Sequence, residues 1–293
     1  MSQALAFAAF VLGPFSFTRR EPNSTDVHID ILFCGVWHSD LHTARCEWPG
    51  TVYPCVAGHE IAGRVASDGS GVTKFKAGDM AAVGCVVDSC SSCDACRHGL
   101  EQHCDRNATV LTYNSPDAHL PGQPIIMAAT PVTSSWMKGS ACGCRRSSDT
   151  AAAAPLLCAG IRPISPLRYW NAGPGKRVGI VGLGGLGHMG VKFAHALGAE
   201  TVLFTTSPSK VADGKRLGAD EVVISSDASA MKAQAGRLDL IVDTVAAAHG
   251  KVPVDDEAAI AGGIGHRSIP ETQEVLDFRA EKGIACGVEV IGI

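Results

Sequence analysis

The sequence predicts a mixed α/β protein with two unlike domains. In the first half, short β-type runs at 27–33, 61–66 and 80–87 are separated by turns rich in Gly, Pro and Asp, which indicates a compact antiparallel domain. From Ala151 onward, strand patterns alternate with helical patterns, which is typical of βαβ units and a parallel sheet. Hydrophobic residues make up 46% of the chain, so it can bury a substantial core.

The elements of the second half follow in order. Arg177–Val181 predicts a buried strand, and Leu186–Leu197 predicts the helix after it. Three further strands are expected, at 201–205, 221–225 and 238–243. Two other segments, 117–150 and 246–268, follow neither the helical nor the strand period, so the sequence predicts no clear element in them.

Charge and hydropathy exclude several classes of function. The chain has 25 Lys and Arg against 29 Asp and Glu and shows no basic stripe, so nucleic acid is not an expected partner. The apolar run 4–17 has no basic residue before it and is followed by Arg19 and Arg20, which is the reverse of a signal peptide. No stretch approaches the roughly 20 apolar residues that cross a bilayer. We expect a cytoplasmic protein, away from membranes, whose 12 cysteines are thiols or metal ligands.

Four cysteines form a tight cluster with the spacing C-x2-C-x2-C-x7-C, namely Cys90, Cys93, Cys96 and Cys104. Four thiolates on one loop can enclose Zn²⁺ in a tetrahedron and leave no position for a substrate, which predicts a structural zinc site. An iron–sulfur cluster is the main alternative. The bacterial ferredoxin spacing, however, places the fourth cysteine after three residues and before Pro, whereas Cys104 comes later and precedes Asp105.

A glycine-rich turn follows the strand at 177–181 and precedes the helix, in the segment GLGGLG at 182–187. This G-x-G-x-x-G spacing permits a tight turn, close approach of a pyrophosphate and close packing of the helix on the strand. The free N–H groups at the helix N-terminus favour the anion. The residues predicted to bind the cofactor here are Gly182, Gly184, Gly185, Leu186 and Gly187.

The end of the following strand predicts which dinucleotide binds. An NAD enzyme normally carries Asp or Glu there to hold the ribose 2′-hydroxyl, and this sequence has no acidic residue at that point. Thr206 and Ser207 offer hydroxyls and Lys210 offers a cation, a combination that suits a 2′-phosphate. We therefore expect NADP(H) rather than NAD(H).

Three further segments carry residues suited to catalysis: CGVWHSDLH at 34–42, PCVAGHE at 54–60 and PLLCAG at 155–160. With the cysteine cluster and the glycine-rich turn, they stand in the order and spacing of the zinc-containing medium-chain dehydrogenases/reductases. The sequence resembles most closely the NADP-dependent, cinnamyl-alcohol-dehydrogenase-like branch. The resemblance covers most of the chain. It implies a GroES-like catalytic domain joined to a Rossmann domain, and the interconversion of primary, including aromatic or cinnamyl, alcohols and aldehydes.

The resemblance also implies a proton path. Ser39 matches the hydroxyl that takes the alcohol proton, and His42 matches the histidine that relays this proton to solvent. Trp48 stands where this branch lines its substrate pocket with an aromatic side chain.

For the catalytic zinc, His59 and Cys158 match two ligands of the family, and Glu60 matches the acidic neighbour that can approach or replace a ligand. The family's first ligand is a cysteine at the position of Trp37, and an indole nitrogen only donates hydrogen bonds, so the site is weakened here. Cys34 could substitute only if the backbone shifts. Two alternatives therefore stay open: a zinc-free quinone or enone reductase of the same superfamily, and a degenerate product that at best binds nucleotide.

The resemblance implies domain limits as well. Residues 1–150 would form the catalytic domain, to which the chain returns at 276–293, and residues 151–275 would form the NADP-binding domain. The segments 117–150 and 246–268 and the C-terminus depart from the family pattern, so an incomplete Rossmann sheet with reduced stability is expected. The expected partners are a small alcohol or aldehyde and a second copy of the chain in a homodimer.

Overall fold

A computed structural model of the chain describes residues 3–9, 12–18, 22–115, 134–138, 141–144, 149–245, 259–261 and 268–291. Contacts between residues divide it into two units, Met1–Cys158 with His266–Ile293, and Ala159–Gly265. The divisions expected from the sequence were at 150/151 and 275/276. Within the described residues, no helix is long and apolar enough to cross a membrane.

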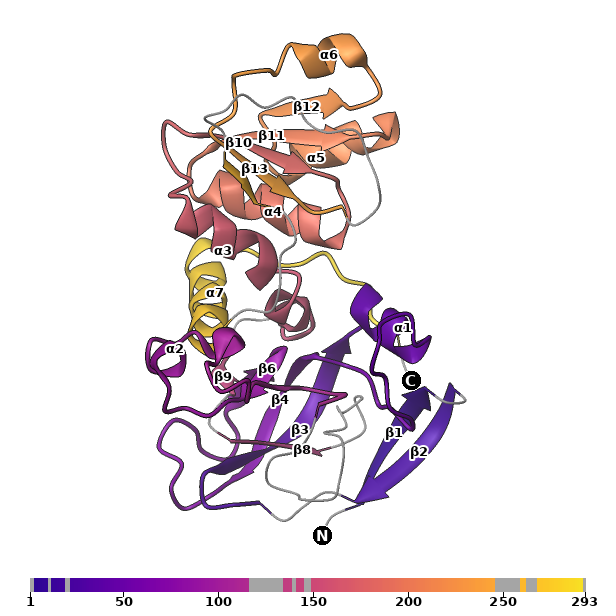
Figure 1. The fold of residues 1–293 in the computed structure, drawn as a ribbon, viewed down its shortest axis with the longest axis vertical. Coiled ribbons are helices and arrows are strands. Elements are labelled where there is room, and N and C mark those ends of the chain that lie inside the picture. Colours follow the sequence, from indigo (N-terminus) through magenta and orange to yellow (C-terminus); the bar gives the residue numbers. More distant parts are fainter. Residues whose placement is uncertain are drawn as a thin grey trace. The chain divides into compact units, whose positions relative to one another are not determined.

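The first unit is built on an antiparallel sheet of five strands in the order β8-β3-β4-β5-β9 (Figure 1). Its strands are β3 (Asp26–Gly35), β4 (Glu60–Asp68), β5 (Met80–Val83), β8 (Ser134–Lys138) and β9 (Cys142–Gly143). Alternate residues of β3 and β4, such as Ile29, Ile31 and Ile61, fill the core of this unit. The antiparallel first domain predicted from the sequence is confirmed.

Smaller elements complete the first unit. Two strand pairs are β1 (Gln3–Ala9) with β2 (Leu12–Thr18), and β6 (Val86–Asp88) with β7 (Val110–Leu111). The helices are α1 (His38–Ala44), α2 (Asp94–Arg97), α7 (Ile269–Lys282) and the 3-10 helices η1 (Glu101–His103) and η2 (Ala151–Leu157). Gln273 on α7 bonds both the N–H and the carbonyl of Gly143, at 2.7 and 3.0 Å, so α7 covers the edge strand β9.

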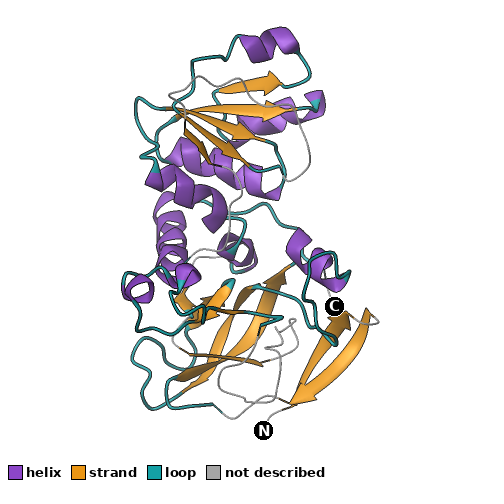
Figure 2. Ribbon diagram, viewed as in Figure 1, coloured by secondary structure: helices purple, strands orange, loops and turns teal. Residues whose placement is uncertain are grey.

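The second unit contains a parallel sheet in the order β12-β11-β10-β13-β14, which is the doubly wound order. Its strands are drawn in orange in Figure 2. Its strands are β10 (Arg177–Val181), β11 (Glu200–Thr205), β12 (Glu221–Ile224), β13 (Leu240–Asp243) and β14 (Ala259–Ala261). Its helices are α3 (Ile161–Tyr169), α4 (Gly185–Ala196), η3 (Pro208–Lys210), α5 (Val211–Leu217) and α6 (Ala228–Lys232). The predicted strand and helix alternation is confirmed.

The structure differs from the sequence expectation in three places. β8 and β9 lie within 117–150, and β14 lies within 246–268, although neither segment predicts a clear strand. These short strands gain their pairing from neighbours distant in the chain, which a local period does not reveal. The run predicted at 80–87 is divided between β5 and β6. The remainder of the two segments, 116–133, 139–140, 145–148, 246–258 and 262–267, lies outside the described residues.

Candidate functional site

One group of metal-binding side chains lies inside the first unit. His59, Cys85 and Cys158 are buried, and each can place one ligand atom so that all three lie within 4.8 Å of one another. Two thiolates and an imidazole are ligands that Zn²⁺ accepts, and three protein ligands leave one position for a substrate. The sequence predicted His59 and Cys158 as ligands, and the structure places them together.

Asp40 and Ser39, at the start of α1, surround His59. The Nδ1 atom of His59 lies 3.1 Å from Oδ1 of Asp40, and its Nε2 atom lies 3.3 Å from the Ser39 hydroxyl. Burial by itself would lower the pKa of His59, but the bonds to Asp40 and Cys158 raise this pKa to about 10. Because Asp40 holds Nδ1, a metal would bind at Nε2 in place of the Ser39 contact, in the way that carboxylates orient metal-binding histidines.

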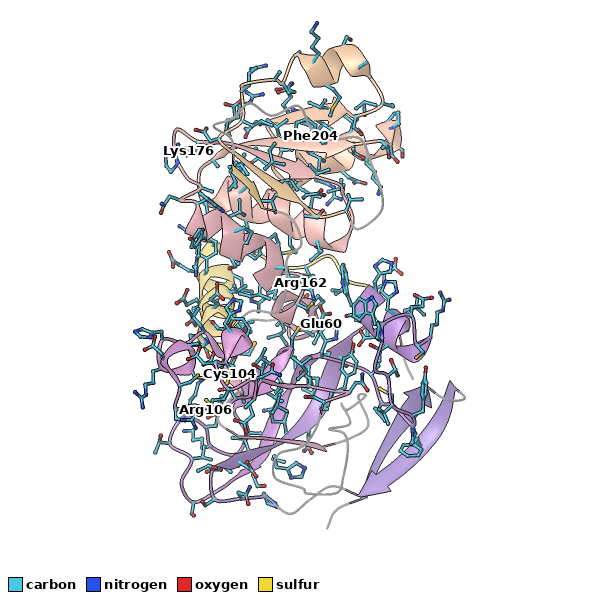
Figure 3. All side chains as sticks on the ribbon, in the orientation of Figure 1. Glu60, Cys104, Arg106, Arg162, Lys176 and Phe204 are labelled. Carbon is cyan, nitrogen blue, oxygen red and sulfur yellow. The ribbon has the colours of Figure 1, made fainter. Side chains whose placement is uncertain are left out.

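Glu60 begins β4 and is 1% exposed (Figure 3). Its carboxylate lies over Gly35 so closely that a Cβ on Gly35 would stand 1.9 Å from Oε2. Glu60 is not a member of the group formed by His59, Cys85 and Cys158. Its predicted role as a ligand or catalytic group stays a prediction.

Trp37 and Cys34 also lie outside this group. Trp37 precedes α1, where its backbone N–H donates to Oδ2 of Asp40 at 2.8 Å and its ring contacts His38 edge-on. Burial raises the pKa of Cys34 to about 12, and its thiol contacts the carbonyl of Gly35 at 3.6 Å. The Cys34 thiol is thus not among the ligand atoms that lie together at His59, Cys85 and Cys158.

His42 connects the buried end of α1 to the surface. It stands three residues after Ser39, so the two side chains share one face of the helix. Its side chain is 38% exposed, whereas Ser39 is 8% exposed. His42 bonds Glu47 through Nδ1 and stacks on Trp48, with ring centroids 5.0 Å apart. The predicted proton path from the buried Ser39 hydroxyl to the half-exposed His42 imidazole stays a prediction.

The four-cysteine cluster is brought together by α2, η1 and the turns around them, in the loop where Figure 3 labels Cys104. Cys90 lies 3.9 Å from Cys96, and Cys93 lies 3.9 Å from Cys104, measured between sulfur atoms. A tetrahedral zinc ion with Zn–S bonds of about 2.3 Å requires sulfur atoms about 3.8 Å apart. Backbone N–H groups of Ser92 and Cys93 lower the pKa of Cys90 to about 6. The cluster therefore fits a structural zinc.

The glycine-rich turn in the second unit is shaped for a phosphate. Gly182 has a φ of +89°, and a Cβ on Gly187 would stand 2.0 Å from the Gly182 carbonyl, so neither position accepts a side chain. Gly184, by contrast, has open space around the position of its missing Cβ. It precedes α4, whose first N–H groups have no acceptor within the helix. The space beside Gly184 can admit a pyrophosphate.

The predicted 2′-phosphate residues lie next to this turn. Lys210 donates from Nζ to the Leu183 carbonyl at 2.9 Å, which holds its ammonium group beside the turn. Ser207 begins η3, and its backbone N–H contacts the Thr205 hydroxyl at 3.3 Å, while Thr206 is exposed. A cation and hydroxyls at the end of β11 suit an anionic ribose substituent.

The sequence did not identify three residues of the first unit's site: Asp40, Cys85 and Tyr113. Asp40 follows Ser39 within the motif CGVWHSDLH at 34–42, so the sequence did offer a signal for this residue. Cys85 had no signal, because it is far from His59 in the sequence and only the folded chain brings the two residues together. Tyr113 packs against His59 with ring centroids 5.8 Å apart, and burial raises its pKa.

The comparisons with known proteins agree with this geometry. Residues 23–147 match the family model described as the alcohol dehydrogenase GroES-like domain, and residues 185–251 match that of the zinc-binding dehydrogenase. The chain is 48% identical to aldehyde reductase YahK of Escherichia coli K12, over 96% of the chain and 87% of the relative.

Two solved cinnamyl alcohol dehydrogenases share the fold. One is from Sorghum bicolor, with a TM-score of 0.88 and 38% identity, and the other, from Helicobacter pylori in complex with NADP(H), has a TM-score of 0.84 and 31% identity. Both alignments cover 99% of this chain and 91% of the solved chain. The GroES-like and Rossmann architecture predicted from the sequence is thereby confirmed. The chain belongs to the family of zinc-containing alcohol dehydrogenases within the medium-chain dehydrogenases/reductases.

Proposed function

We propose that this chain is an NADP(H)-dependent, zinc-containing oxidoreductase that interconverts primary alcohols, cinnamyl-type alcohols among them, and aldehydes. The observation that carries the proposal is the buried group of His59, Cys85 and Cys158 beside the Ser39 hydroxyl. The names of the relatives, an aldehyde reductase and cinnamyl alcohol dehydrogenases, support the same activity. The metal-binding group favours this reading over a zinc-free reductase.

In this proposal, the first unit provides the catalytic residues and the second unit binds NADP(H). When bound, zinc supplies a Lewis acid for the substrate oxygen, and NADP(H) accepts or supplies the hydride. Ser39 takes the proton of the alcohol hydroxyl, and His42 passes it to solvent from its half-exposed position. Asp40 holds His59 in orientation from Nδ1. In the second unit, the turn at Gly184 receives the pyrophosphate, and Lys210 with Thr206 and Ser207 receives the 2′-phosphate.

The assignment of domains, location and assembly follows from the same proposal. The first unit is the catalytic domain and the second is the NADP(H)-binding domain. We infer a cytoplasmic location, since cysteines that bind zinc as thiolates are typical of reducing compartments. We infer a homodimer from the family resemblance. A dimer would elute in light-scattering chromatography at about twice the 30.4 kDa of the chain.

The test of this function separates binding from folding. Gly184→Val adds a side chain where the protein leaves open space, so the fold should persist while the cofactor is excluded. Gly287→Val is the matched control, because Gly287 also has open surroundings and lies outside the second unit. We expect NADPH fluorescence titration and aldehyde turnover to fail in Gly184→Val alone. A wild-type protein that neither binds NADPH nor reduces any aldehyde contradicts the proposal.

The preference for NADP(H) has its own test. Lys210→Ala should weaken NADPH binding about tenfold, which corresponds to the loss of one charge-assisted contact, and should leave NADH binding unchanged. Fluorescence titrations with the two reduced cofactors measure this difference. Equal losses for NADPH and NADH would show that Lys210 does not contact a 2′-phosphate.

A further inference from the structure

Position 37, where the family places its first zinc-ligand cysteine, holds Trp37 in this chain. We propose that Cys85 supplies the missing sulfur, so that His59, Cys85 and Cys158 hold the second zinc ion. The inference rests on the proposed function for the catalytic role of that ion, whereas the ligand set is taken from the geometry of the first unit. Cys85 would thus replace the zinc ligand that other members of the family have at position 37, in another part of the fold.

The ligand atoms are close to the distances that zinc requires. His59, Cys85 and Cys158 bring one ligand atom each to within 4.8 Å of the other two. A tetrahedral zinc ion sets sulfur atoms about 3.8 Å apart and a sulfur and a nitrogen about 3.6 Å apart. The ligand atoms of the three side chains therefore need to approach by at most about 1.2 Å, which small rotations about χ1 provide.

Sheet pairing brings together the strand ends beside which His59 and Cys85 lie. In the antiparallel pair of β4 and β5, Ile61 faces Val83 and Ala62 faces Ala82. His59 precedes β4 by one residue and Cys85 follows β5 by two, so both residues lie at the same edge of this strand pair. Their ligand atoms lie within 4.8 Å of each other, so the two side chains can share one metal ion.

The backbone at Cys85 is fixed by Thr112. The Cys85 carbonyl accepts two bonds of 3.0 Å from this residue, one from its backbone N–H and one from its hydroxyl. The same hydroxyl also donates to the Gly84 carbonyl. Thr112 is 1% exposed, so water does not compete for these bonds. The thiol of Cys85 is therefore attached to a rigid backbone, as a metal ligand should be.

Gly84 allows η2 to approach Cys85. The Leu157 carbonyl stands 3.2 Å from the position of a Cβ on Gly84, which is closer than an ordinary contact. Cys158 follows Leu157 directly and is fully buried. The absence of a side chain at Gly84 thus lets the backbone that carries Cys158 pass beside the backbone that carries Cys85.

Zinc content measured by plasma mass spectrometry on the full chain tests the proposal. We expect two zinc ions per wild-type chain, one per chain in Cys85→Ser, and two in Cys55→Ser, which changes another fully buried cysteine outside the group. The double variant Trp37→Cys with Cys85→Ser should recover the second ion, because it restores the family's ligand. Two zinc ions in Cys85→Ser, or one in the wild type, would overturn the proposal.

Cobalt substitution of the wild-type chain covers the case in which Cys85→Ser does not fold. Thiolate-to-Co²⁺ charge-transfer absorption rises with the number of Co–S bonds, so six bonds per chain are expected, four from the cysteine cluster and two from Cys85 and Cys158. Five bonds would overturn the proposal. These readouts need neither NADPH nor substrate. Failure of the proposed function would instead appear as a wild-type chain that holds two metal ions but shows no NADPH-dependent turnover.

Discussion

The two carboxylate oxygens of Asp40 have different partners. Oδ2 accepts the Trp37 backbone N–H at 2.8 Å, and Oδ1 lies 3.1 Å from Nδ1 of His59. The first contact fixes the start of α1, and the second orients the imidazole. One side chain thus couples the position of the helix that carries Ser39 to the direction of a metal ligand.

Asp40→Asn should weaken binding of the second zinc ion about 10- to 100-fold, the usual loss when the partner of a metal-binding histidine is changed. The amide keeps the shape of the side chain but removes the charge that favours the Nδ1–H tautomer of His59. Competition with a chromophoric chelator measures the affinity. Asp30→Asn, an exposed change on β3, is the control. Equal affinities in Asp40→Asn and Asp30→Asn would refute this role.

Gly187→Ala should disrupt the glycine-rich turn itself. The new Cβ would stand 2.0 Å from the Gly182 carbonyl, which is backbone and cannot move aside cheaply. We expect the second unit to lose about 1–3 kcal/mol of stability, as in other overpacked sites, and NADPH binding to fall with it. Urea unfolding followed by circular dichroism measures the loss. Gly184→Val provides the contrast, since it should lose NADPH binding and keep its stability.

At the scale of single residues, the sequence predicts those functional residues that stand in short sequence motifs. His59, Cys158, Ser39 and the four clustered cysteines stand in short motifs. The structure brings the four cysteines together and places His59 beside Cys158 and Ser39, whereas Glu60 lies outside the ligand group. Cys85 could not be predicted because its distance to His59 depends on the register of β4 and β5, which the sequence alone does not specify.

At the scale of elements, the break between β5 and β6 has the greatest effect on the site. The sequence predicts one run over 80–87, because its residues are apolar throughout. The structure interrupts it at Gly84 and Cys85, where Thr112 binds both carbonyls. Cys85, at this interruption, belongs to the ligand group, and Thr112, which bonds its carbonyl, lies far along the chain.

The strands β10 and β13 are joined at their N-terminal ends by Asp239. Its carboxylate accepts from the Arg177 backbone N–H at 2.8 Å and from the Lys176 ammonium at 3.0 Å, and these contacts lower the pKa of Asp239. Since the pKa is lower in the folded state, the stabilisation is present above the unfolded pKa, about 4, and is lost as pH falls through the folded value.

Asp239→Asn should therefore be less stable than the wild type at pH 7, by less than about 1 kcal/mol because the carboxylate is partly exposed. The difference should shrink as the pH falls below about 4 and vanish below the folded pKa of Asp239. Urea unfolding midpoints of the wild type and of Asp239→Asn, measured over this pH range, test this expectation. Asp213→Asn, whose carboxylate pairs with Arg216 on the surface of α5, is the control. A difference that persists at low pH would show that shape rather than charge joins the strands.

At the scale of the molecule, each unit has a core of its own. Val27, Ile29 and Ile61 belong to the first, whereas Val202, Phe204 and Ile241 belong to the second. The proposed zinc ligands all belong to the first unit, and the residues proposed to bind NADP(H) all belong to the second. The sequence predicted this division of chemistry from its change of pattern near Ala151, but not the short strands β8, β9 and β14.

Calorimetry should consequently show two separable transitions. A zinc chelator should lower the melting temperature of the first unit and leave the second unchanged, because metal binding stabilises only the state that forms the site. NADPH at about 100 times its Kd should stabilise the second unit by about 2.7 kcal/mol. Scans of wild-type protein with each additive measure both effects. A single transition that responds equally to both additives would contradict the assignment.

The two proposed zinc sites differ in the length of chain that each must close. The cysteine cluster lies within residues 90–104, whereas the other ligands are drawn from His59, Cys85 and Cys158. A short loop closes at little entropic cost, but the second site needs β4, β5 and η2 already in place. During synthesis, the first ion could be captured as soon as Cys104 leaves the ribosome, while the second must wait until Cys158 has emerged and packed. The chain would acquire its metals in a fixed order, structural before catalytic.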